Sequence, residues 1–455
     1  MFEFGRELRR LFVEATGVPR DGLTGGDASL LELLDLQLLT NEGRSADIAA
    51  GRISTPDRAQ RKLEAAIIWR EVARRTGDPI PLRRAAASAE ASAEAFDRNR
   101  RPDGWARARC EQAFCAMLGA ELFGDAGLNA AAAIALREAR DAARGGLARP
   151  LAEVGLATLD GRLALVSGDA ELARSIAARF DAPISALATL TRRCRAARLL
   201  VVEARLLRAD LLMGWGARLR DHELLSQAMS ETDLATEGLD NAYEPLSWAR
   251  AQAMRGQAFA LMGETMGEVE SLADSVTALA DVLDELTRDH SPLDWARAQT
   301  SLAQGLQALG EASQSERAYE QAVTCYDRAG LVLKDAPSLT LQALVASNRA
   351  LCLARAAELS GDLAVLDAAE AAFKIELSNL AAGSDPTAWA LLQVNLARLY
   401  EARADITGRD RGERASASMA LEAALDVFAE QGLRSLSMVA ADALERLNGS
   451  SRTVS

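Results

Sequence analysis

Residues 292–311 read PLDWARAQTSLAQGLQALGE, and the motif Pro-x-x-Trp-Ala that opens this stretch occurs four times in the chain. Its tryptophans are Trp105, Trp248, Trp295 and Trp389. The second and third lie 47 residues apart, and the third and fourth lie 94 residues apart, which is twice 47. An interval of this length that repeats predicts a chain built from one recurring structural unit.

The 47-residue interval also organises stretches that lack the tryptophan. Steps of 47 from Trp295 place helix starts near residues 201, 248, 295, 342, 389 and 436. Six positions after a start comes a block of four residues whose third member is small: Ala209, Gly256, Ala303, Ala350 and Ala397. Because small residues let two helices approach closely, we expect helices to cross at this position.

Local signals divide each unit into two helices. Proline suits the first helical turn, where its missing N–H would have no partner, and Ser291 or Asp385 before the proline can accept bonds from the unpaired amides. A glycine followed by an acid predicts the end of the first helix and the start of the second. These pairs are Gly263-Glu264, Gly310-Glu311, Gly361-Asp362, Gly168-Asp169 and Gly77-Asp78. Apolar stripes on both helices require each hairpin to pack on its neighbours.

The repeat resembles a known family. Residues 318–326, AYEQAVTCY, together with the small positions, resemble tetratricopeptide repeats (TPRs). Pro-x-x-Trp-Ala, followed by Gln and then by Leu-Gly-Glu, resembles the long-repeat TPR arrays common in bacteria. The interval of 47 exceeds the usual TPR length of about 34 residues, which implies longer helices. The resemblance implies an all-α fold, a right-handed α-solenoid of antiparallel helical hairpins.

We expect four segments along the chain. Residues 1–54 form an N-terminal helical cap, 55–244 degenerate TPR-like repeats, 245–432 regular 47-residue TPR-like repeats, and 433–455 a C-terminal capping helix with a loose tail. The first segment carries an amphipathic stripe of Met1, Phe4, Leu8, Leu11 and Phe12. A helix that docks a partner or lies on a membrane surface is the alternative to a cap.

Composition indicates a bacterial protein of the cytoplasm. Arginine far outnumbers lysine, which occurs only at Lys62, Lys334 and Lys374, as expected of a GC-rich genome. The five cysteines are scattered without a Cys-x-x-Cys pair, so we expect neither a disulfide framework nor a zinc site. The N-terminus is charged from its third residue and no apolar run reaches membrane-spanning length, so we expect neither a secretory signal nor membrane contact.

Residues needed for common enzyme chemistry are scarce. The chain has two histidines, His222 and His290, and lacks a Gly-x-x-x-x-Gly-Lys-Ser/Thr loop, a dinucleotide-binding glycine motif and a Gly-x-Ser-x-Gly elbow. Acidic residues are frequent, and no pair of them stands out as catalytic. We therefore predict a non-catalytic protein without a cofactor or a metal ion. The tryptophans are assigned to packing between hairpins, since no second aromatic residue lies near them in sequence.

Charge is distributed unevenly along this chain of net charge −13. Residues 1–133 sum to −1, residues 134–220 to +6 and residues 221–455 to −18. The acidic C-terminal half would attract a basic partner segment. Four arginines of the middle segment are candidates for binding carboxylates or phosphates: Arg192, Arg195, Arg205 and Arg208. The alternative is that these charges are solvated or paired within the protein; nucleic acid is not expected, because the chain is acidic.

The TPR resemblance implies that the first helix of each hairpin lines a concave surface. Counting from each repeat start selects the partner-binding candidates Arg250, Gln257, Arg297, Thr300, Gln304, Gln307, Arg398 and Glu401. Such a polar groove suits the backbone of an extended or helical peptide, and simple solvation of the surface is the alternative. We predict a protein-interaction scaffold or adaptor that binds another protein or peptide in this groove. The other hypothesis is a sensory regulator that binds a small peptide or metabolite and relays the change through its N-terminal segment.

Overall fold

The computed structural model describes residues 31–52, 57–165, 169–191, 196–237, 239–334, 338–379, 386–430 and 434–452. Every regular element in these ranges is an α-helix, and no strand occurs among them. The chain forms two compact units. Unit 1 contains Met1–Ser301 and Val332–Thr340, and unit 2 contains Leu302–Leu331 and Leu341–Ser455.

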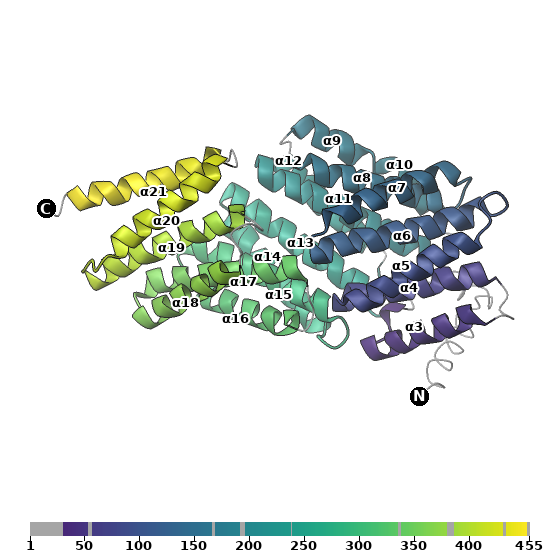
Figure 1. Ribbon diagram of the computed structural model, residues 1–455, viewed down its shortest axis with the longest axis horizontal. Helices are drawn as coiled ribbons and strands as arrows, with labels where there is room; N and C mark the ends of the chain where they lie inside the picture. Colours follow the sequence, from purple (N-terminus) through teal and green to yellow (C-terminus); the bar gives the residue numbers. More distant parts are fainter. Residues whose placement is uncertain are drawn as a thin grey trace. The chain divides into compact units, whose positions relative to one another are not determined.

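Figure 1 labels the described helices from α3 to α21 in chain order. Those within unit 1 are α3 (Leu36–Gly51), α4 (Arg58–Thr76), α5 (Pro79–Ala95), α6 (Pro102–Phe123), α7 (Ala126–Ala142), α8 (Ala148–Ala164), α9 (Ala170–Ala178), α10 (Asp181–Leu190), α11 (Ala196–Leu219), α12 (His222–Thr236), α13 (Pro245–Met266) and α14 (Val269–Glu285). Helix α15 (Pro292–Ser313) begins in unit 1 and continues into unit 2. Apart from a few terminal residues, unit 2 then contains α16 (Glu316–Leu333), α17 (Leu339–Ser360), α18 (Leu363–Asn379), α19 (Pro386–Thr407), α20 (Glu413–Glu430) and α21 (Arg434–Arg452).

Consecutive helices pack against each other as antiparallel hairpins. In unit 1, α4 packs on α5, α6 on α7, α11 on α12 and α13 on α14; in unit 2, α19 packs on α20. The second helix of a hairpin also contacts the first helix of the next one, as α5 does with α6 and α12 with α13. Hairpins that cannot bury their apolar stripes alone bury them in this way against the neighbouring hairpin. The expected all-α fold of stacked helical hairpins is confirmed.

Helix starts recur at a constant interval in the C-terminal half of the chain. Helices α13, α15, α17 and α19 start at residues 245, 292, 339 and 386, each 47 residues after the one before. Helices α12, α14, α16 and α18 start at residues 222, 269, 316 and 363, again in steps of 47. Three of the first helices begin at the proline of the motif rather than at its tryptophan, because proline is compatible with the first helical turn.

The predicted close crossing of two helices is confirmed at Gly256. A Cβ atom on Gly256 would lie 2.6 Å from Cγ of Leu279, which belongs to α14. The hydroxyl of Ser275, also on α14, donates a 2.7 Å hydrogen bond to the carbonyl of Gly256. The alanines at the equivalent positions are buried: Ala209, Ala303, Ala350 and Ala397.

Two of the predicted helix ends are wrong. Gly263 and Gly310 lie inside α13 and α15, and α13 instead ends at Gly267, whose φ is 73°. Gly263 and Gly310 are glycines for another reason, since a Cβ would lie 2.8 Å from Leu272 and 3.2 Å from the ring of Tyr319.

The same rule works at other hairpins. Gly77 has φ 71° and closes α4, and Asp78 accepts a 2.8 Å bond from the amide of Ile80. Gly361 and Asp362 do the same between α17 and α18, where Gly361 has φ 68°. A left-handed conformation at the helix end followed by a capping acid is the arrangement that the sequence predicted. Gly168 lies outside the described residues.

The tryptophans of the motif act in packing, as predicted. Trp248 and Trp295 pack on one apolar cluster that joins α13, the C-terminal end of α14 and the start of α15. Trp105 packs on two clusters, and the guanidinium of Arg98 lies 4.5 Å from its ring centroid. Trp389 packs on a cluster that includes α20 and α21.

The predicted N-terminal cap falls partly outside the described residues, which begin at Leu31; the stripe from Met1 to Phe12 is among those not described. Helix α3 packs on α4, with Leu39 and Trp69 in one apolar cluster. The cap and the four-segment division stay predictions. Among the described helices, none combines the length and the apolar character needed to cross a membrane.

Candidate functional site

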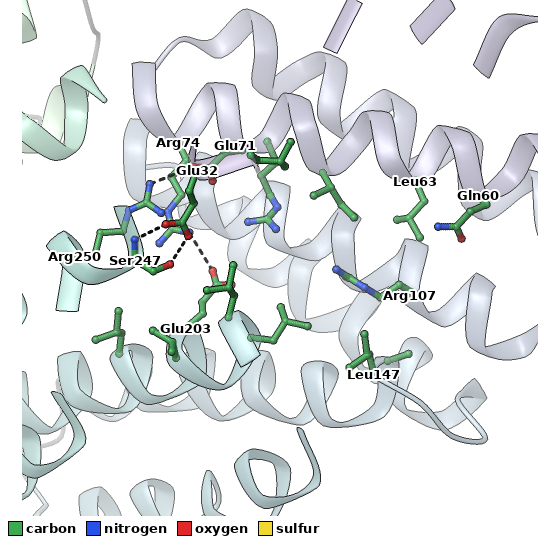
Figure 2. Close-up of a pocket in the computed structure, with 18 of the residues that line it drawn as sticks. Glu32, Gln60, Leu63, Glu71, Arg74, Arg107, Leu147, Glu203, Ser247 and Arg250 are labelled. Atoms are coloured by element: carbon green, nitrogen blue, oxygen red, sulfur yellow. Dashed lines mark hydrogen bonds and ion pairs between the residues drawn. The ribbon is translucent and has the colours of Figure 1, made fainter. Parts of the chain in front are cut away.

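A cavity of about 300 Å³ lies within unit 1. Its wall consists of residues from α4, α6, α11 and α13, from the start of α8, and from Leu31 and Glu32 (Figure 2). Much of the lining is apolar: Leu31, Leu63, Ile67, Leu147, Leu199 and Leu206. Ligand pockets typically measure about 300–1,000 Å³, so this one has room for a few side chains.

Arginines on the cavity wall are held by acids. Arg70 and Arg107 both pair with the buried carboxylate of Glu111, and Arg74 of α4 pairs with Glu203 of α11 at 3.5 Å. Burial lowers the pKa of Arg70, and the nearby Glu111 and Glu203 raise it by more, so the side chain stays charged. One face of α4 therefore presents guanidinium groups in fixed positions.

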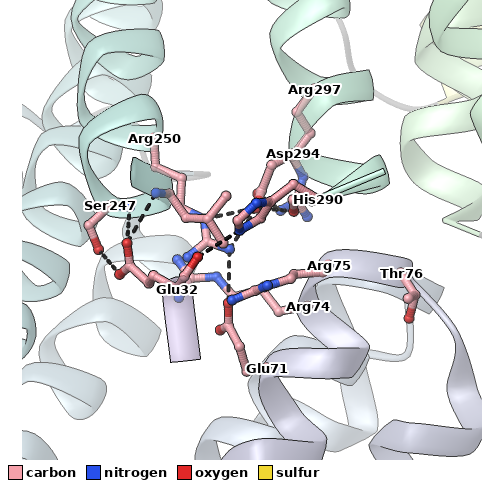
Figure 3. Close-up of polar contacts among 12 residues, drawn as sticks. Glu32, Glu71, Arg74, Arg75, Thr76, Ser247, Arg250, His290, Asp294 and Arg297 are labelled. Carbon is pink, nitrogen blue, oxygen red and sulfur yellow. Dashed lines mark hydrogen bonds and ion pairs between the residues drawn. The ribbon is translucent and has the colours of Figure 1, made fainter. Parts of the chain in front are cut away.

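Arg250 of α13 connects the cavity to a buried cluster of ion pairs (Figure 3). Its Nη2 lies 2.6 Å from Oδ2 of Asp294 and 3.5 Å from Oε1 of Glu71. Burial raises the pKa of Glu71, but Arg250 and Arg75 outweigh burial and bring this pKa down to about 2. Arg250 likewise outweighs burial at Asp294 and holds its pKa below the ordinary value. The cluster is therefore ionised at neutral pH and joins α4, α13 and α15.

Glu32 extends this cluster to the N-terminal end of α13. Its side chain is buried, and its Oε2 accepts hydrogen bonds from the amides of Leu246 at 3.1 Å and Ser247 at 2.9 Å. Its Oε1 accepts a 2.5 Å bond from the hydroxyl of Ser247. Burial raises the pKa of Glu32 by more than Arg250 and the bonds from Ser247 lower it. A carboxylate at this place satisfies amides that have no partner within the helix.

Two further side chains hold the backbone around Glu32. Arg75 is fully buried and donates from Nη1 to the carbonyl of Leu34 at 2.7 Å and from Nη2 to that of Leu31 at 2.8 Å. Nε2 of His290 lies 2.6 Å from the carbonyl oxygen of Glu32, which can only accept, so His290 carries its proton on Nε2. Burial and the charge of Arg75 lower the pKa of His290, which is therefore neutral at pH 7.

Four of the partner-binding candidates lie in unit 1, and Arg250 is the one that lines this cavity. Arg297 pairs with Glu121 of α6 at 2.5 Å. Gln257 donates a hydrogen bond to a serine hydroxyl of α15. Thr300 is buried and donates a 2.8 Å bond to a carbonyl of its own helix. The structure therefore does not bring these four side chains together in one site.

The other four candidates lie in unit 2. Arg398 and Glu401 line a second cavity of about 450 Å³ between α17, α19 and α21. Burial raises the pKa of Glu401 against the lowering effect of Arg446. Gln307 accepts a 3.2 Å bond from the hydroxyl of a tyrosine on α16, and Gln304 is half-buried on α15.

Two of the four anion-binding candidates are paired within the protein. Arg205 and Arg208 of α11 both contact Glu231, at 2.9 and 3.2 Å, and Arg208 also lies 2.8 Å from Asp181. This pairing is the alternative that the sequence left open. Arg192 and Arg195 lie outside the described residues, and anion binding stays a prediction.

The residues around Glu32 were missed at the sequence level: Glu32, Glu71, Arg75 and Asp294. One signal was present, since residues 30–39 read LLELLDLQLL and place two acids within a leucine-rich run. The described residues contain no group of three or more His, Cys, Asp or Glu that could hold a metal ion. What the cavity offers is a set of binding contacts, namely apolar side chains beside oriented guanidinium and carboxylate groups.

No protein-family model and no curated protein matches the chain. Among solved structures, a Rap protein complexed with competence and sporulation factor is 13% identical, with a TM-score of 0.48 over 87% of this chain and 99% of that one. A circular tandem repeat protein with a novel repeat topology is 18% identical, with a TM-score of 0.28 over 93% of this chain and 98% of that one. At these TM-scores, the fold and the site rest on this chain's own helices and contacts.

Proposed function

We propose that this chain is a non-catalytic interaction scaffold whose unit 1 cavity binds a short segment of a partner protein. The supporting observation is the composition of the cavity wall, where apolar side chains of α4 and α11 lie beside guanidinium groups of α4, α6 and α13. Buried apolar surface contributes about 25 cal/mol per Å² to binding, and guanidinium groups can donate to peptide carbonyls. A peptide with apolar side chains suits such a wall.

We also infer that the array belongs to the long-repeat TPR-like type, with residues 55–244 as degenerate and 245–432 as regular repeats. The constant 47-residue step of both helices of the hairpin supports this proposal. In this array Arg398 and Glu401, at the unit 2 cavity, are a second place for partner contact. The charge of −18 over residues 221–455 favours a partner with a basic segment, because opposite net charge speeds encounter.

A cavity-filling variant tests the proposed site. The full-length protein is used to select binders from a phage library of random dodecapeptides, and the affinities of synthetic copies are measured by fluorescence anisotropy. In Ile67→Trp, an indole replaces a smaller apolar side chain on the cavity wall and occupies part of the cavity beside α4. Ile134→Trp makes the same replacement at an exposed position of α7 and is the matched control.

Peptides that use the cavity should bind Ile67→Trp at least tenfold more weakly than the wild type and bind Ile134→Trp equally well. Equal affinity for all three proteins would refute the proposed site. Melting temperatures measured alongside show whether a loss of affinity reflects a loss of folded protein.

A sensory regulator is the second candidate, and one observation favours it. Leu31 and Glu32, from the segment before the first described helix, form part of the cavity wall. A small peptide or metabolite in the cavity would therefore contact the N-terminal segment directly. A ligand of this kind should raise the melting temperature by mass action and change hydrogen exchange in residues 31–52. Stabilisation without any change in that segment would count against this role.

A further inference from the structure

The N-terminal end of α13 is occupied by a carboxylate from a distant part of the chain. Glu32 accepts from the amides of Leu246 and Ser247 and from the hydroxyl of Ser247, 214 and 215 residues away in sequence. Glu244, at the N-cap position of α13, makes no capping bond with its own side chain. The amides at this helix end therefore depend on Glu32, and the positive end of the helix dipole favours its charge.

Glu32 belongs to a short segment, the strap, defined here as residues 31–35. Within the strap, Glu32 is the side chain that is buried, while Leu31, Leu33 and Leu34 are half-buried and Asp35 is exposed. The backbone of the strap is held by Arg75 at two carbonyls and by His290 at a third. The deepest contact of the strap is thus a carboxylate in a set of donors, a contact that another carboxylate can reproduce.

Groups that interact with the carboxylate of Glu32 also border the cavity. Glu32, Ser247 and Arg250 all line it, so a molecule inside the cavity meets Ser247, whose hydroxyl donates to Glu32, and the guanidinium of Arg250, whose charge acts on Glu32 (Figure 2). Apolar wall residues lie beyond them, including Ile67 and Leu206. A ligand with a carboxylate next to apolar side chains would match both parts of the wall.

We infer that the strap is an intramolecular occupant of a carboxylate site at the N-terminal end of α13, and that a peptide carboxylate entering the cavity displaces Glu32 from Leu246 and Ser247. This inference rests on the proposed function, because it assigns the class of ligand to that same cavity. It makes the strap an autoinhibitory contact. The peptide carboxylate and the carboxylate of Glu32 then compete for the same amides, so binding of the ligand releases residues 31–35.

Hydrogen exchange at single amides of the full-length protein tests this exchange, using mass spectrometry with fragmentation. In Glu32→Ala, which removes the acceptor, the amides of Leu246 and Ser247 should exchange at least tenfold faster than in the wild type. Asp35→Ala removes the other carboxylate of the strap and is the matched control. Asp35 accepts from Leu38 of its own helix at 2.7 Å, so this variant should leave the two amides of α13 unchanged.

Three tetrapeptide probes at millimolar concentration identify the carboxylate. Acetyl-Leu-Glu-Leu-Leu-amide copies residues 31–34 and should restore protection of the two amides in Glu32→Ala. Acetyl-Leu-Gln-Leu-Leu-amide should not. Acetyl-Leu-Gln-Leu-Leu with a free C-terminus shows whether a terminal carboxylate serves as well as a side chain. On the wild type, the glutamate probe should speed exchange in residues 31–38, which keeps the test valid if Glu32→Ala does not fold.

Unchanged exchange of Leu246 and Ser247 in Glu32→Ala, or equal effects of the glutamate and glutamine probes, would overturn the inference. These outcomes differ from failure of the proposed function. If the glutamate probe restores protection while Ile67→Trp leaves every library peptide bound, the carboxylate site stands and the peptide-binding cavity is refuted. If Ile67→Trp abolishes peptide binding while the probes have no effect, the cavity stands and the strap exchange is refuted.

Discussion

Arg250 of α13 and Asp294 of α15 form a buried ion pair between successive first helices, with Nη2 and Oδ2 2.6 Å apart and the side chains 13% and 5% exposed. The two residues lie 44 positions apart in sequence. The same separation recurs in two further polar contacts between successive first helices: Gln257 with Ser301, and Arg355 with Glu311. Polar contacts, and not only apolar ones, therefore recur with the repeat.

Removing the charge of Arg250 should strongly destabilise the protein. Arg250→Gln leaves Asp294 and Glu71 buried without their shared partner, which costs about 3–5 kcal/mol of unfolding free energy. Urea denaturation followed by circular dichroism measures this. The control is Arg255→Gln on the same helix, because Arg255 is 37% exposed in its pair with Asp233 and should contribute below about 1 kcal/mol. Equal losses in the two variants would contradict the role given to the buried pair.

Stability should fall with pH in acid because of Glu71. Its pKa is lowered from 4.5 to about 2, so its ionised form stabilises the folded state above pH 4.5, and this stability is lost as the pH falls towards 2. Glu32, whose pKa is raised, contributes with the opposite sign. The slope of unfolding free energy against pH between 4.5 and 2 should be shallower in Glu71→Gln than in the wild type. Parallel slopes would show that Glu71 does not carry this dependence.

A single methyl group at the helix crossing should be destabilising. In Gly256→Ala the new Cβ would lie 2.6 Å from Leu279, which forces the side chain or the helix to move and costs about 1–3 kcal/mol. Gly330 in α16 has no neighbour within 4 Å of its Cβ position, so Gly330→Ala should stabilise by about 0.4–1 kcal/mol. Thermal melts measure this difference: the melting temperature should fall in Gly256→Ala and rise in Gly330→Ala. A stabilised Gly256→Ala would mean that the two helices are not in close contact there.

Buried thiols should react slowly with alkylating reagents. Cys110, Cys115, Cys325 and Cys352 are all buried, and burial raises the pKa of Cys110 and of Cys352 to about 12. Since the thiolate is the reactive form, iodoacetamide at pH 8 should modify these four far more slowly in the folded protein than in urea. Peptide mapping by mass spectrometry measures each site. Rapid native modification of Cys110 would contradict its position in the core.

The repeating part of the fold was predictable because it depends on local features. A proline that begins a helix and a small residue at a crossing act through neighbours a fixed distance away in sequence, so their period is visible in the residues. Gly263 and Gly310 show the limit of this reasoning. Glycine is required both for a left-handed helix end and for close packing, and the sequence does not tell which one applies. At Gly263 and Gly310 the reason is close packing, because the large side chains of Leu272 and Tyr319 lie against them.

The site was less predictable, because its contacts join residues far apart in sequence. Arg250 was selected by its position in the repeat, and it does line the unit 1 cavity. Thr300 was selected by the same count, and its side chain is buried against its own helix. Glu32 lies outside the repeats and reaches Ser247 across 215 positions, a contact that no periodicity encodes.

The 47-residue step between helix starts bears on how such a chain changes length in evolution. Duplication or loss of one whole module keeps each helix in register with the neighbour on which it packs, so neighbouring modules remain compatible. An insertion of one or two residues within a helix turns the apolar stripe away from its neighbour by about 100° per residue. Homologues of this protein should therefore differ in size by whole modules, with irregular insertions confined to the turns.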